Sequence, residues 1–536
     1  MMAPNTSLCR LLKPTALELH SASLSPAGRC LPLVPRCRYS RTVGSAPAKK
    51  ERVLILGSGW AGYALARSLS RRKYDCSVIS PRGYFVFTPL LAGTAVGTLE
   101  FRAILEPVRR AGVGFYQGWA DDIDFRHKKV LVEPNALDDM AGRTVIPSKQ
   151  SKEKAVKVAK FEVPYDKLVI AVGAYSQTFG IEGVREHANF LRDIGDARRI
   201  RLRVLSLFEQ CSYPSASTDD VQVASTPGAP TPLTEADKRK LLHFAIVGGG
   251  PTGIEYAAEL HDLIHEDLAK LYPELVPLVR ITVYDVAPKV LPMFDEALAK
   301  YAMNTFDRQG ITIKTKHHLQ RLSLDDGYLG TEHGAIKIKI QEYGDEEEYA
   351  GMVVWSTGLM QNPLVEKLVN KAFIPVQPHT EPVTHHILKD KRTGGIVVDP
   401  YLRARITTSE TTTEPDEAKA TLDDVFVIGD CAVMENNRTL PKTAQVASQQ
   451  ATYLAARLNA GDVTEKEFKF RNWGTLTYLG NWKAIHQSHA DELRGWVAWI
   501  LWRGAYLTRS MSWRNKILVP VHWFISWLFG RGISRF

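Results

Sequence analysis

Two glycine-rich turns carry the most specific chemistry in this chain. The first, residues 57–62 (GSGWAG), follows the apolar run 53–56. The second, residues 248–253 (GGGPTG), follows the apolar run 243–247. In each, a strand enters a tight turn whose glycines let a pyrophosphate approach the backbone, and the next helix directs unpaired N–H groups at the phosphates. Two such turns predict two bound dinucleotides, and the usual pair that exchanges electrons is a flavin and a nicotinamide.

The residue that ends the second strand of each unit is predicted to meet a ribose. After the second turn this residue is Asp285, and an acid there accepts hydrogen bonds from a 2′-hydroxyl and repels a 2′-phosphate. NADH is therefore favoured over NADPH. After the first turn the residue is Ser80, whose hydroxyl can still bind a ribose. Arg82 is free to meet the pyrophosphate or the adenosine, and the alternative is a solvated turn residue.

Both turns need strand–helix–strand units to position them, and this unit occurs twice. The pattern predicts an α/β fold with two Rossmann-like dinucleotide-binding domains. Polar stretches near 136–160, 212–236, 379–395 and 407–420 are predicted to be insertions and connectors. The predicted strands are 53–56, 76–80, 165–171, 243–247, 280–285 and 421–430, and the predicted helices are 62–71, 253 to about 271 and 443 to about 458.

Basic residues concentrate at the two ends of the chain. Residues 1–50 hold eight Lys or Arg against the single acid Glu18 and are rich in Ser and Pro. This composition is typical of a mitochondrial or plastid transit peptide, which we place at 1–48, and a disordered basic tail is the alternative. Because the net charge of +10 lies largely at the ends, we expect no nucleic-acid-binding face on the body of the protein.

The C-terminal end is both basic and aromatic. From Leu493 onward there are seven Lys or Arg, no acid and six of the chain's eleven tryptophans. The longest uncharged run, 517–530, is shorter than the ~20 residues that span a bilayer. We therefore expect amphipathic helices that lie in the lipid headgroup plane, with Arg503 extending from the apolar face toward the headgroups. An aromatic dimer interface or a core-packing helix pair is the alternative, which leaves a homodimer through this region open.

These pieces, in this order, resemble the glutathione-reductase-like flavoproteins, in which a nicotinamide domain is inserted into a flavin domain. A closer resemblance is to the mitochondrial type II (alternative, rotenone-insensitive) NADH:ubiquinone oxidoreductases. That resemblance runs from about residue 50 to the C-terminus and implies noncovalent FAD, NADH as donor, ubiquinone as acceptor and no proton pumping. The segments that carry it are 53–60, 78–91, 247–255, 441–449 and 476–480.

The resemblance also implies domains and contact residues. It places FAD-binding parts at 49–200 and 395–462, an NADH-binding domain at 201–394 and a membrane-anchoring region at 463–536. Asp430 would accept a hydrogen bond from a ribityl hydroxyl. The residues implied for FAD are Gly57, Ser58, Gly59, Trp60, Ala61, Gly62, Ser80, Pro81, Arg82, Thr88, Val172, Gly173, Ala174, Gly429, Asp430 and Ala444. Those implied for NADH are Gly248, Gly250, Pro251, Thr252, Gly253, Asp285, Thr357 and Gly358.

Three polar residues are candidates for the quinone reaction. Hydride transfer from a nicotinamide to a flavin needs positioning and no acid or base, whereas quinone reduction consumes protons. Glu255, one turn into the second helix, can relay a proton if burial raises its pKa. The alternative is a carboxylate that complements the helix dipole or holds the nicotinamide amide. Gln445 and Gln449 share one helix face, and the resemblance makes that helix the floor of a quinone pocket, with a polar face over the core as the alternative.

Location and rival functions follow from what the sequence lacks. No stop-transfer run follows the N-terminal segment, which predicts import into the matrix and a peripheral position on the matrix side of the inner membrane. A sulfide:quinone oxidoreductase would need paired reactive cysteines, and Cys431 is the one candidate. A redox-signalling flavoprotein of the same fold would need neither a quinone helix nor a lipid anchor. No residues have metal-ligand spacing, so we expect no metal site.

Overall fold

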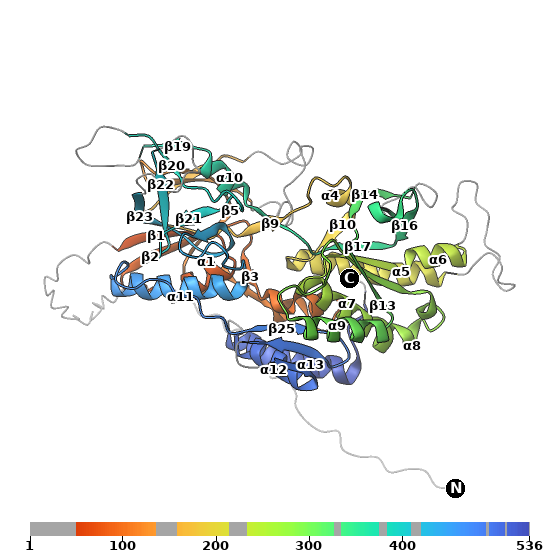
Figure 1. The fold of residues 1–536 in the computed structure, drawn as a ribbon. Helices are drawn as coiled ribbons and strands as arrows, with labels where there is room; N and C mark the ends of the chain where they lie inside the picture. The colour runs from red at the N-terminus through yellow and green to blue at the C-terminus, as the bar shows by residue number, and fades with distance from the viewer. Residues whose placement is uncertain are drawn as a thin grey trace, which may run out of the picture. The chain divides into compact units, whose positions relative to one another are not determined.

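The computed structural model of the protein describes residues 50–135, 158–213, 233–325, 334–374, 383–408, 420–488, 492–509 and 512–534 (Figure 1). The predicted transit peptide at 1–48 lies outside the described residues, as do most of the polar stretches predicted near 136–160, 212–236 and 407–420.

A large sheet holds the first glycine turn. Its core strands are continuously apolar and buried, as expected for parallel strands covered on both faces. Strand β1 (Glu51–Leu56) pairs in parallel with β2 (Tyr74–Ser80) on one side and β8 (Lys167–Ile170) on the other, and β8 pairs in parallel with β23 (Ala420–Val427), so the carboxyl ends of these four strands meet at one edge. The sheet order is β19 (Ala372–Phe373), β20 (His385–Ile387), β22 (Arg403–Thr407), β23 (Ala420–Val427), β8 (Lys167–Ile170), β1 (Glu51–Leu56), β2 (Tyr74–Ser80), β5 (Gly114–Asp124), β6 (Lys129–Pro134) and β7 (Phe161–Pro164).

A second parallel sheet holds the second glycine turn. Strand β11 lies between β12 and β17, and all its residues are buried. The interval 201–394 that we predicted for this domain begins after β10 and takes in β19 and β20, which pair in the first sheet. The order is β10 (Ala188–Phe190), β17 (Met352–Trp355), β11 (His243–Val247), β12 (Arg280–Asp285) and β13 (Ile311–Thr315), with a separate sheet of β14 (Leu319–Leu324), β15 (Ile336–Ile340) and β16 (Glu347–Ala350).

A short antiparallel pair joins the two sheets. Strand β9 (Ala174–Ser176) follows β8 of the first sheet, and β18 (Leu359–Gln361) follows β17 of the second sheet. Because these two strands pair with each other, the chain crosses between the sheets at one place, next to the carboxyl ends of the strands. Apolar residues from both sheets belong to one continuous hydrophobic core.

A helix follows directly on each glycine turn. Helix α1 (Trp60–Ser68) follows the first turn and packs on α11 (Ala444–Ala460), as Figure 1 shows. Helix α7 (Pro251–Asp262) follows the second turn and has proline in its first position, where no N–H is needed. We predicted a helix from 253 to about 271, and the structure has α7, a π-helical segment (Leu263–Leu268) and α8 (Ala269–Leu271). Further helices ahead of the C-terminal region include α2 (Leu91–Ala95), α5 (Ile194–Ser212), α6 (Glu235–Leu241), α9 (Glu296–Arg308) and α10 (Pro363–Val369).

The C-terminal region forms a three-stranded meander and two helices. Strands β25 (Thr475–Tyr478), β26 (Ala484–Gln487) and β27 (Glu492–Gly495) lead into α12 (Trp496–Arg509), which packs on all three. Helix α13 (Trp513–Phe529) follows and packs against α12 (Figure 1). None of the helices in the described part of the chain combines the length and apolarity that crossing a membrane requires.

Candidate functional site

A cavity of about 560 Å³ lies where the carboxyl ends of the two sheets meet. It is lined by the first glycine turn, by residues 171–176 after β8, by Gly429 and Asp430 after β23 and by residues 355–359 after β17. The first turn of α7, the N-terminal part of α11, Leu476 and Tyr506 also line it. One hollow is therefore bounded by both nucleotide-binding units and by the C-terminal region.

Nearly all residues predicted for the flavin dinucleotide line this cavity. The exception is Gly62, which lies in α1 beneath the turn. The residues that do line it are Gly57, Ser58, Gly59, Trp60, Ala61, Ser80, Pro81, Arg82, Thr88, Val172, Gly173, Ala174, Gly429, Asp430 and Ala444.

The two glycine turns have the same local geometry. In the first turn a Cβ on Gly62 would lie 2.0 Å from the carbonyl oxygen of Gly57, so close packing of helix on turn demands glycine there. In the second turn a Cβ on Gly253 would lie 2.0 Å from the carbonyl oxygen of Gly248. A Cβ on the middle glycine, Gly59, would meet nothing within 4 Å. That open approach to the backbone fits a pyrophosphate in the first turn.

Hydroxyl groups tie the first turn to the end of β2. The hydroxyls of Ser58 and Ser80 are buried and 2.9 Å apart, and Ser80 also accepts a hydrogen bond from the backbone N–H of Arg82. Trp60 donates its indole N–H to the hydroxyl of Thr88 at 2.9 Å. Ser80, for which we predicted a ribose contact, lines the cavity while it holds this loop in place.

Arg192 is a cation of the cavity that the sequence did not reveal. It immediately precedes Asp193, the N-cap of α5, and lines the cavity near Arg82 and Asp430. Its Nη1 atom is buried and has no hydrogen-bond partner among the described residues. Burial lowers the pKa of Arg192, and the nearby carboxylate of Asp430 opposes that effect. A buried guanidinium nitrogen without a partner fits an anionic group, such as a phosphate, in the cavity.

The end of β23 and the start of α11 form the opposite wall. The backbone N–H of Gly429 donates to Oε1 of Gln450 at 2.7 Å, and Gln450 is fully buried in α11. Lys442 lines the cavity, donates to the carbonyl oxygen of Ala432 and has its pKa lowered by burial. Neither Gln450 nor Lys442 was among the predicted residues; Lys442 lies in the segment 441–449 that carries the resemblance, and Gln450 follows that segment directly.

Only part of the second turn reaches the cavity. Pro251 and Thr252 line it, as do Thr357 and Gly358 after β17. The carboxylate of Asp285 accepts hydrogen bonds from the backbone N–H groups of Gly249 and Ala287. The other predicted NADH residues, Gly248, Gly250, Gly253 and Asp285, are not part of the cavity lining.

The two predicted glutamines hold a neighbouring segment. Gln449 donates to the carbonyl oxygen of Arg471 at 2.8 Å and accepts from its N–H at 3.0 Å. Gln445 accepts from the N–H of Trp473 at 3.4 Å. The α11 residues that line the cavity are Ala444 and Ala447. These small side chains leave space beside the helix, and the glutamine amides fix the chain that leads to β25.

Glu255 lines the cavity and is buried. Its Oε1 accepts a hydrogen bond from the backbone N–H of Tyr478 at 3.2 Å, and Tyr506 lies close to it. Burial raises the pKa of Glu255 to about 8, with the Tyr478 N–H opposing the effect. A carboxyl group that holds its proton at neutral pH can act as a proton donor to a group in the cavity.

The cysteines of the described residues do not supply a thiol site. The three described cysteines, Cys76, Cys211 and Cys431, are free and buried. Cys431 donates its S–H to the carbonyl oxygens of Ile170 and Ile428, and burial raises its pKa to about 11. A reactive thiolate needs a lowered pKa, so this geometry argues against the sulfide-oxidising alternative.

The C-terminal helices combine a buried face with an exposed apolar face. Arg503 lies between the rings of Trp499 and Trp523, 4.3 and 4.4 Å from their centroids. Our expectation that Arg503 extends to lipid headgroups was wrong, because stacking between two indoles draws the guanidinium inward. The large apolar side chains exposed on the two helices are Trp496, Val497, Ile500, Leu501, Trp513, Ile517, Val521, Phe524, Ile525, Trp527, Leu528 and Phe529.

Comparisons with known proteins cover almost the whole described chain. The pyridine nucleotide-disulphide oxidoreductase family model matches residues 51–451, and the NDH2 C-terminal domain model matches 473–532. The chain is 37% identical to a probable NADH dehydrogenase of Dictyostelium discoideum, over 91% of this chain and 92% of the relative. It is 33% identical to a mitochondrial internal alternative NAD(P)H-ubiquinone oxidoreductase A1 of Solanum tuberosum, over 91% and 88%.

A solved structure has the same fold. The structure of NDH2 from Plasmodium falciparum in complex with NADH superimposes with a TM-score of 0.71 at 23% identity, covering 91% of this chain and all of that chain.

Proposed function

The chain belongs to the pyridine nucleotide-disulphide oxidoreductases and, among them, to the type II or alternative NAD(P)H:ubiquinone oxidoreductases, and on that premise we propose how its residues perform the reaction. It is an FAD-dependent enzyme that oxidises NADH and reduces a quinone without pumping protons. The observation that carries the proposal is the single cavity of about 560 Å³ bounded by both nucleotide-binding units.

The first nucleotide-binding unit is suited to hold FAD. Bound FAD supplies the chemistry of accepting two electrons as hydride and passing them to a quinone. The open backbone at Gly59 and the unpartnered Nη1 of Arg192 are placed to bind the pyrophosphate. The carboxylate of Asp430 is placed to accept a hydrogen bond from a hydroxyl of the ribityl chain. At Gly173 the space beside the backbone is open, because a Cβ there would meet no protein atom within 4 Å.

The second unit is suited to present NADH to the same cavity. The N-terminus of α7, at Pro251 and Thr252, is one wall, and its free N–H groups favour a phosphate nearby. Thr357 and Gly358 form the adjacent wall. Asp285 fixes the second glycine turn through the Gly249 N–H and keeps an acid at the ribose position, which excludes a 2′-phosphate.

The quinone is proposed to enter between α11 and the C-terminal region. Ala444, Ala447, Leu476 and Tyr506 line that end of the cavity together with Glu255. The alanines leave room for a flat ring, and Gln445 and Gln449 hold the 471–473 segment that shapes the entrance. Glu255 donates a proton to a quinone oxygen from its neutral form.

The exposed apolar face of α12 and α13 is proposed to rest on a lipid surface. A ubiquinone dissolved in the bilayer then reaches the cavity directly. Aromatic side chains interleaved with Arg suit the headgroup region of an anionic membrane. We propose a mitochondrial enzyme that binds the matrix side of the inner membrane peripherally. If protease digests the protein in mitochondria whose outer membrane is ruptured and whose inner membrane is intact, the matrix-side position is contradicted.

Steady-state assays test the reaction. Purified protein should be yellow, should oxidise NADH with a short-chain ubiquinone, and should prefer NADH to NADPH. Sulfide in place of NADH should give no quinone reduction, since Cys431 is buried and protonated. Colourless protein, or flavin that NADH bleaches and no benzoquinone reoxidises, would refute the proposed function.

A further inference from the structure

A second buried carboxyl group lies behind Glu255. Glu259 is one helical turn further along α7 and is 6% exposed. A small cavity lies between the two glutamates and is lined by both of them, by Tyr478 and by Trp502. Its volume is about 10 Å³, about the minimum that holds one water molecule. Glu259 does not line the large cavity, so it cannot contact the quinone directly.

An unsatisfied donor points to a water molecule in this small cavity. Trp502 is 5% exposed, and its Nε1 atom has no hydrogen-bond partner among the residues that the structure describes. The indole lies close enough to Glu255 and Tyr506 to lower the pKa of each as a hydrogen-bond donor does, but its Nε1 atom lies outside hydrogen-bond geometry with both. A water needs two to four polar partners, and Glu255, Glu259 and the Trp502 N–H provide three.

We propose that Glu259 recharges Glu255 with a proton through a single water molecule held between them by Trp502. The proposal rests on the proposed function, because a proton is needed at Glu255 only if a quinone is reduced beside it. Glu259 is then a positioning residue that supplies protons through Glu255.

The proton balance of the reaction requires such a supply. Two electrons pass from NADH to the quinone. One quinol hydrogen comes from NADH, and the other is a proton that ultimately comes from the solvent. Glu255 loses its proton as a quinol O–H bond forms. The water gives a proton to the Glu255 carboxylate and takes one from the Glu259 carboxyl, and Glu259 recovers its proton from solvent. No electrons move in these transfers.

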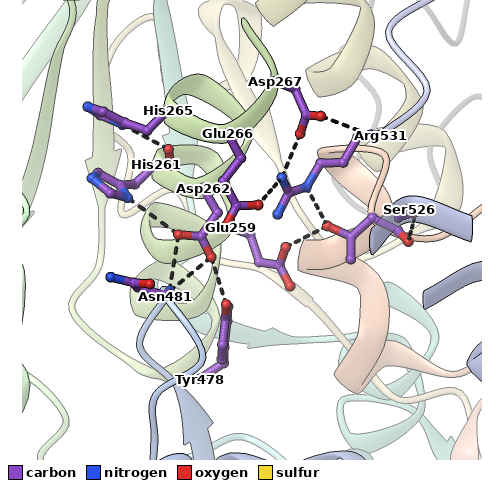
Figure 2. Close-up of polar contacts among 11 residues, drawn as sticks. Glu259, His261, Asp262, His265, Glu266, Asp267, Tyr478, Asn481, Ser526 and Arg531 are labelled. Atoms are coloured by element: carbon purple, nitrogen blue, oxygen red, sulfur yellow. Dashed lines mark hydrogen bonds and ion pairs between the residues drawn. The ribbon is translucent and has the colours of Figure 1, made fainter. Parts of the chain in front are cut away.

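The surroundings of Glu259 fix its position. The Thr98 hydroxyl donates to its Oε2 at 2.7 Å, and Nε of Arg531 donates to that hydroxyl at 3.0 Å. Arg531 also pairs with Asp267 and Glu266 of the π-helical segment, both at 2.7 Å (Figure 2). Thr98 and Arg531 therefore hold one carboxyl oxygen of Glu259 and leave the other for the small cavity.

Charged and titratable groups from every neighbouring element act on Glu259. Burial is the largest effect and raises its pKa to about 7, and Asp262 on the same helix adds to the increase. Arg531 of the C-terminal segment and Arg503 of α12 lower it, and Tyr478 of the meander lies nearby. Glu259 thus exchanges its proton near neutral pH, where a relay group works best.

Three further titratable residues lie beyond Glu259 on the same helical stretch. Figure 2 shows Asp262, His261 and His265 following Glu259 along the same helical stretch. Nδ1 of His261 lies 3.4 Å from Oδ1 of Asp262, and the rings of His261 and the exposed His265 stack at 4.0 Å.

The test separates the two half-reactions of the Glu259→Gln holoenzyme. Glutamine keeps the volume and cannot release a proton. Reduction of the flavin by NADH should keep its wild-type rate, and reoxidation by a short-chain ubiquinone should slow about tenfold. The dependence of the reoxidation rate on pH near 7 should disappear, and Glu259→Asp should restore part of the rate. Glu266→Gln is the matched control, because Glu266 also pairs with Arg531 and lines neither cavity, so its rates should equal wild type.

Several results would overturn the proposal. A FAD-loaded Glu259→Gln protein with the wild-type reoxidation rate and pH profile would do so. If Glu259→Gln does not fold, infrared difference spectra of wild type during quinone reduction decide the matter: two protonated carboxyl signals should change, and a single signal overturns the relay. If wild-type flavin is reduced by NADH but no quinone reoxidises it, the proposed function has failed, which is a different outcome.

Discussion

The side chains around Glu255 affect its pKa more strongly than the dipole of the helix that carries it. The first turns of a helix favour a charged carboxylate by about 0.3–1 kcal/mol through the helix dipole. Glu255 nevertheless lies among Tyr478, Trp502 and Tyr506, and desolvation raises its pKa to about 8. The neutral acid is therefore the form present at neutral pH, and it is the form that a reaction consuming protons requires.

The pH dependence of quinone reduction follows from this shift. Because the pKa of Glu255 is raised, the donor form predominates below pH about 8 and is lost above it. The rate of flavin reoxidation by quinone should fall as the pH rises through about 8. In Glu255→Gln the rate should be about a hundredfold lower and this decline should be absent. Stopped-flow measurement of the two half-reactions checks this, and an equal loss in flavin reduction by NADH would argue for a binding role instead.

At the scale of elements, each strand–turn–helix unit uses its glycines for two purposes. Close packing inside the protein requires the last glycine of each turn, because a Cβ on Gly62 would lie 2.0 Å from the carbonyl oxygen of Gly57. The middle glycine of the first turn, Gly59, faces open space in the cavity and is needed by the ligand. Packing and binding can therefore be separated by substitution within one turn.

A matched pair of alanine substitutions tests this separation. Gly59→Ala should fold with a melting temperature of the FAD-free protein near that of wild type, because its Cβ meets no protein atom within 4 Å. It should bind FAD at least about tenfold more weakly, since the methyl group occupies the pyrophosphate approach. Gly62→Ala should lose stability by several kcal/mol through overpacking. Flavin absorbance per protein and thermal unfolding measure both effects, and a fully flavinated Gly59→Ala protein would contradict the assignment.

At the scale of the whole molecule, the C-terminal region is bound to both nucleotide-binding units. Tyr478 donates its hydroxyl to Asp262 of α7 at 2.7 Å. Asn515 and Ser526 of α13 donate to backbone carbonyl oxygens of Leu105 and Thr98, on the flavin side. The same region thus lines the cavity and carries the exposed apolar face, and a lipid surface bound to this face would lie beside the proposed quinone entrance.

Membrane binding should depend on that face. Trp513 and Phe529 are 80% and 78% exposed, and transferring such side chains out of water stabilises binding by about 1.5–3 kcal/mol each. Trp513→Ser with Phe529→Ser should weaken binding to vesicles containing anionic lipid by more than about tenfold, with unchanged oxidation of NADH by a water-soluble quinone. Leu271→Ser, an exposed apolar residue elsewhere, is the control. Unchanged vesicle flotation together with a lost dimer in solution would favour the dimer interface.

The sequence determined the features that depend on local chain geometry. Both glycine turns, the strands beside them, Ser80 and Arg82 were predicted because apolar runs, glycines and their spacing act within a few residues, whereas residues 172–174 and 429–430 came from the family resemblance. The structure brings these segments together around one cavity. The family followed from the same segments, and the comparisons confirm it.

Only the tertiary structure decided which polar groups lose contact with water. Arg192, Gln450 and Glu259 are unremarkable in the sequence, and each depends on elements that are distant along the chain. Gln445 and Gln449, which share one helix face and which the family resemblance implied for the quinone, hold the 471–473 segment instead of lining the cavity. Desolvation and hydrogen bonding are set by neighbours in space. The two glutamates of α7 therefore take on their raised pKa values only once the C-terminal region packs over them.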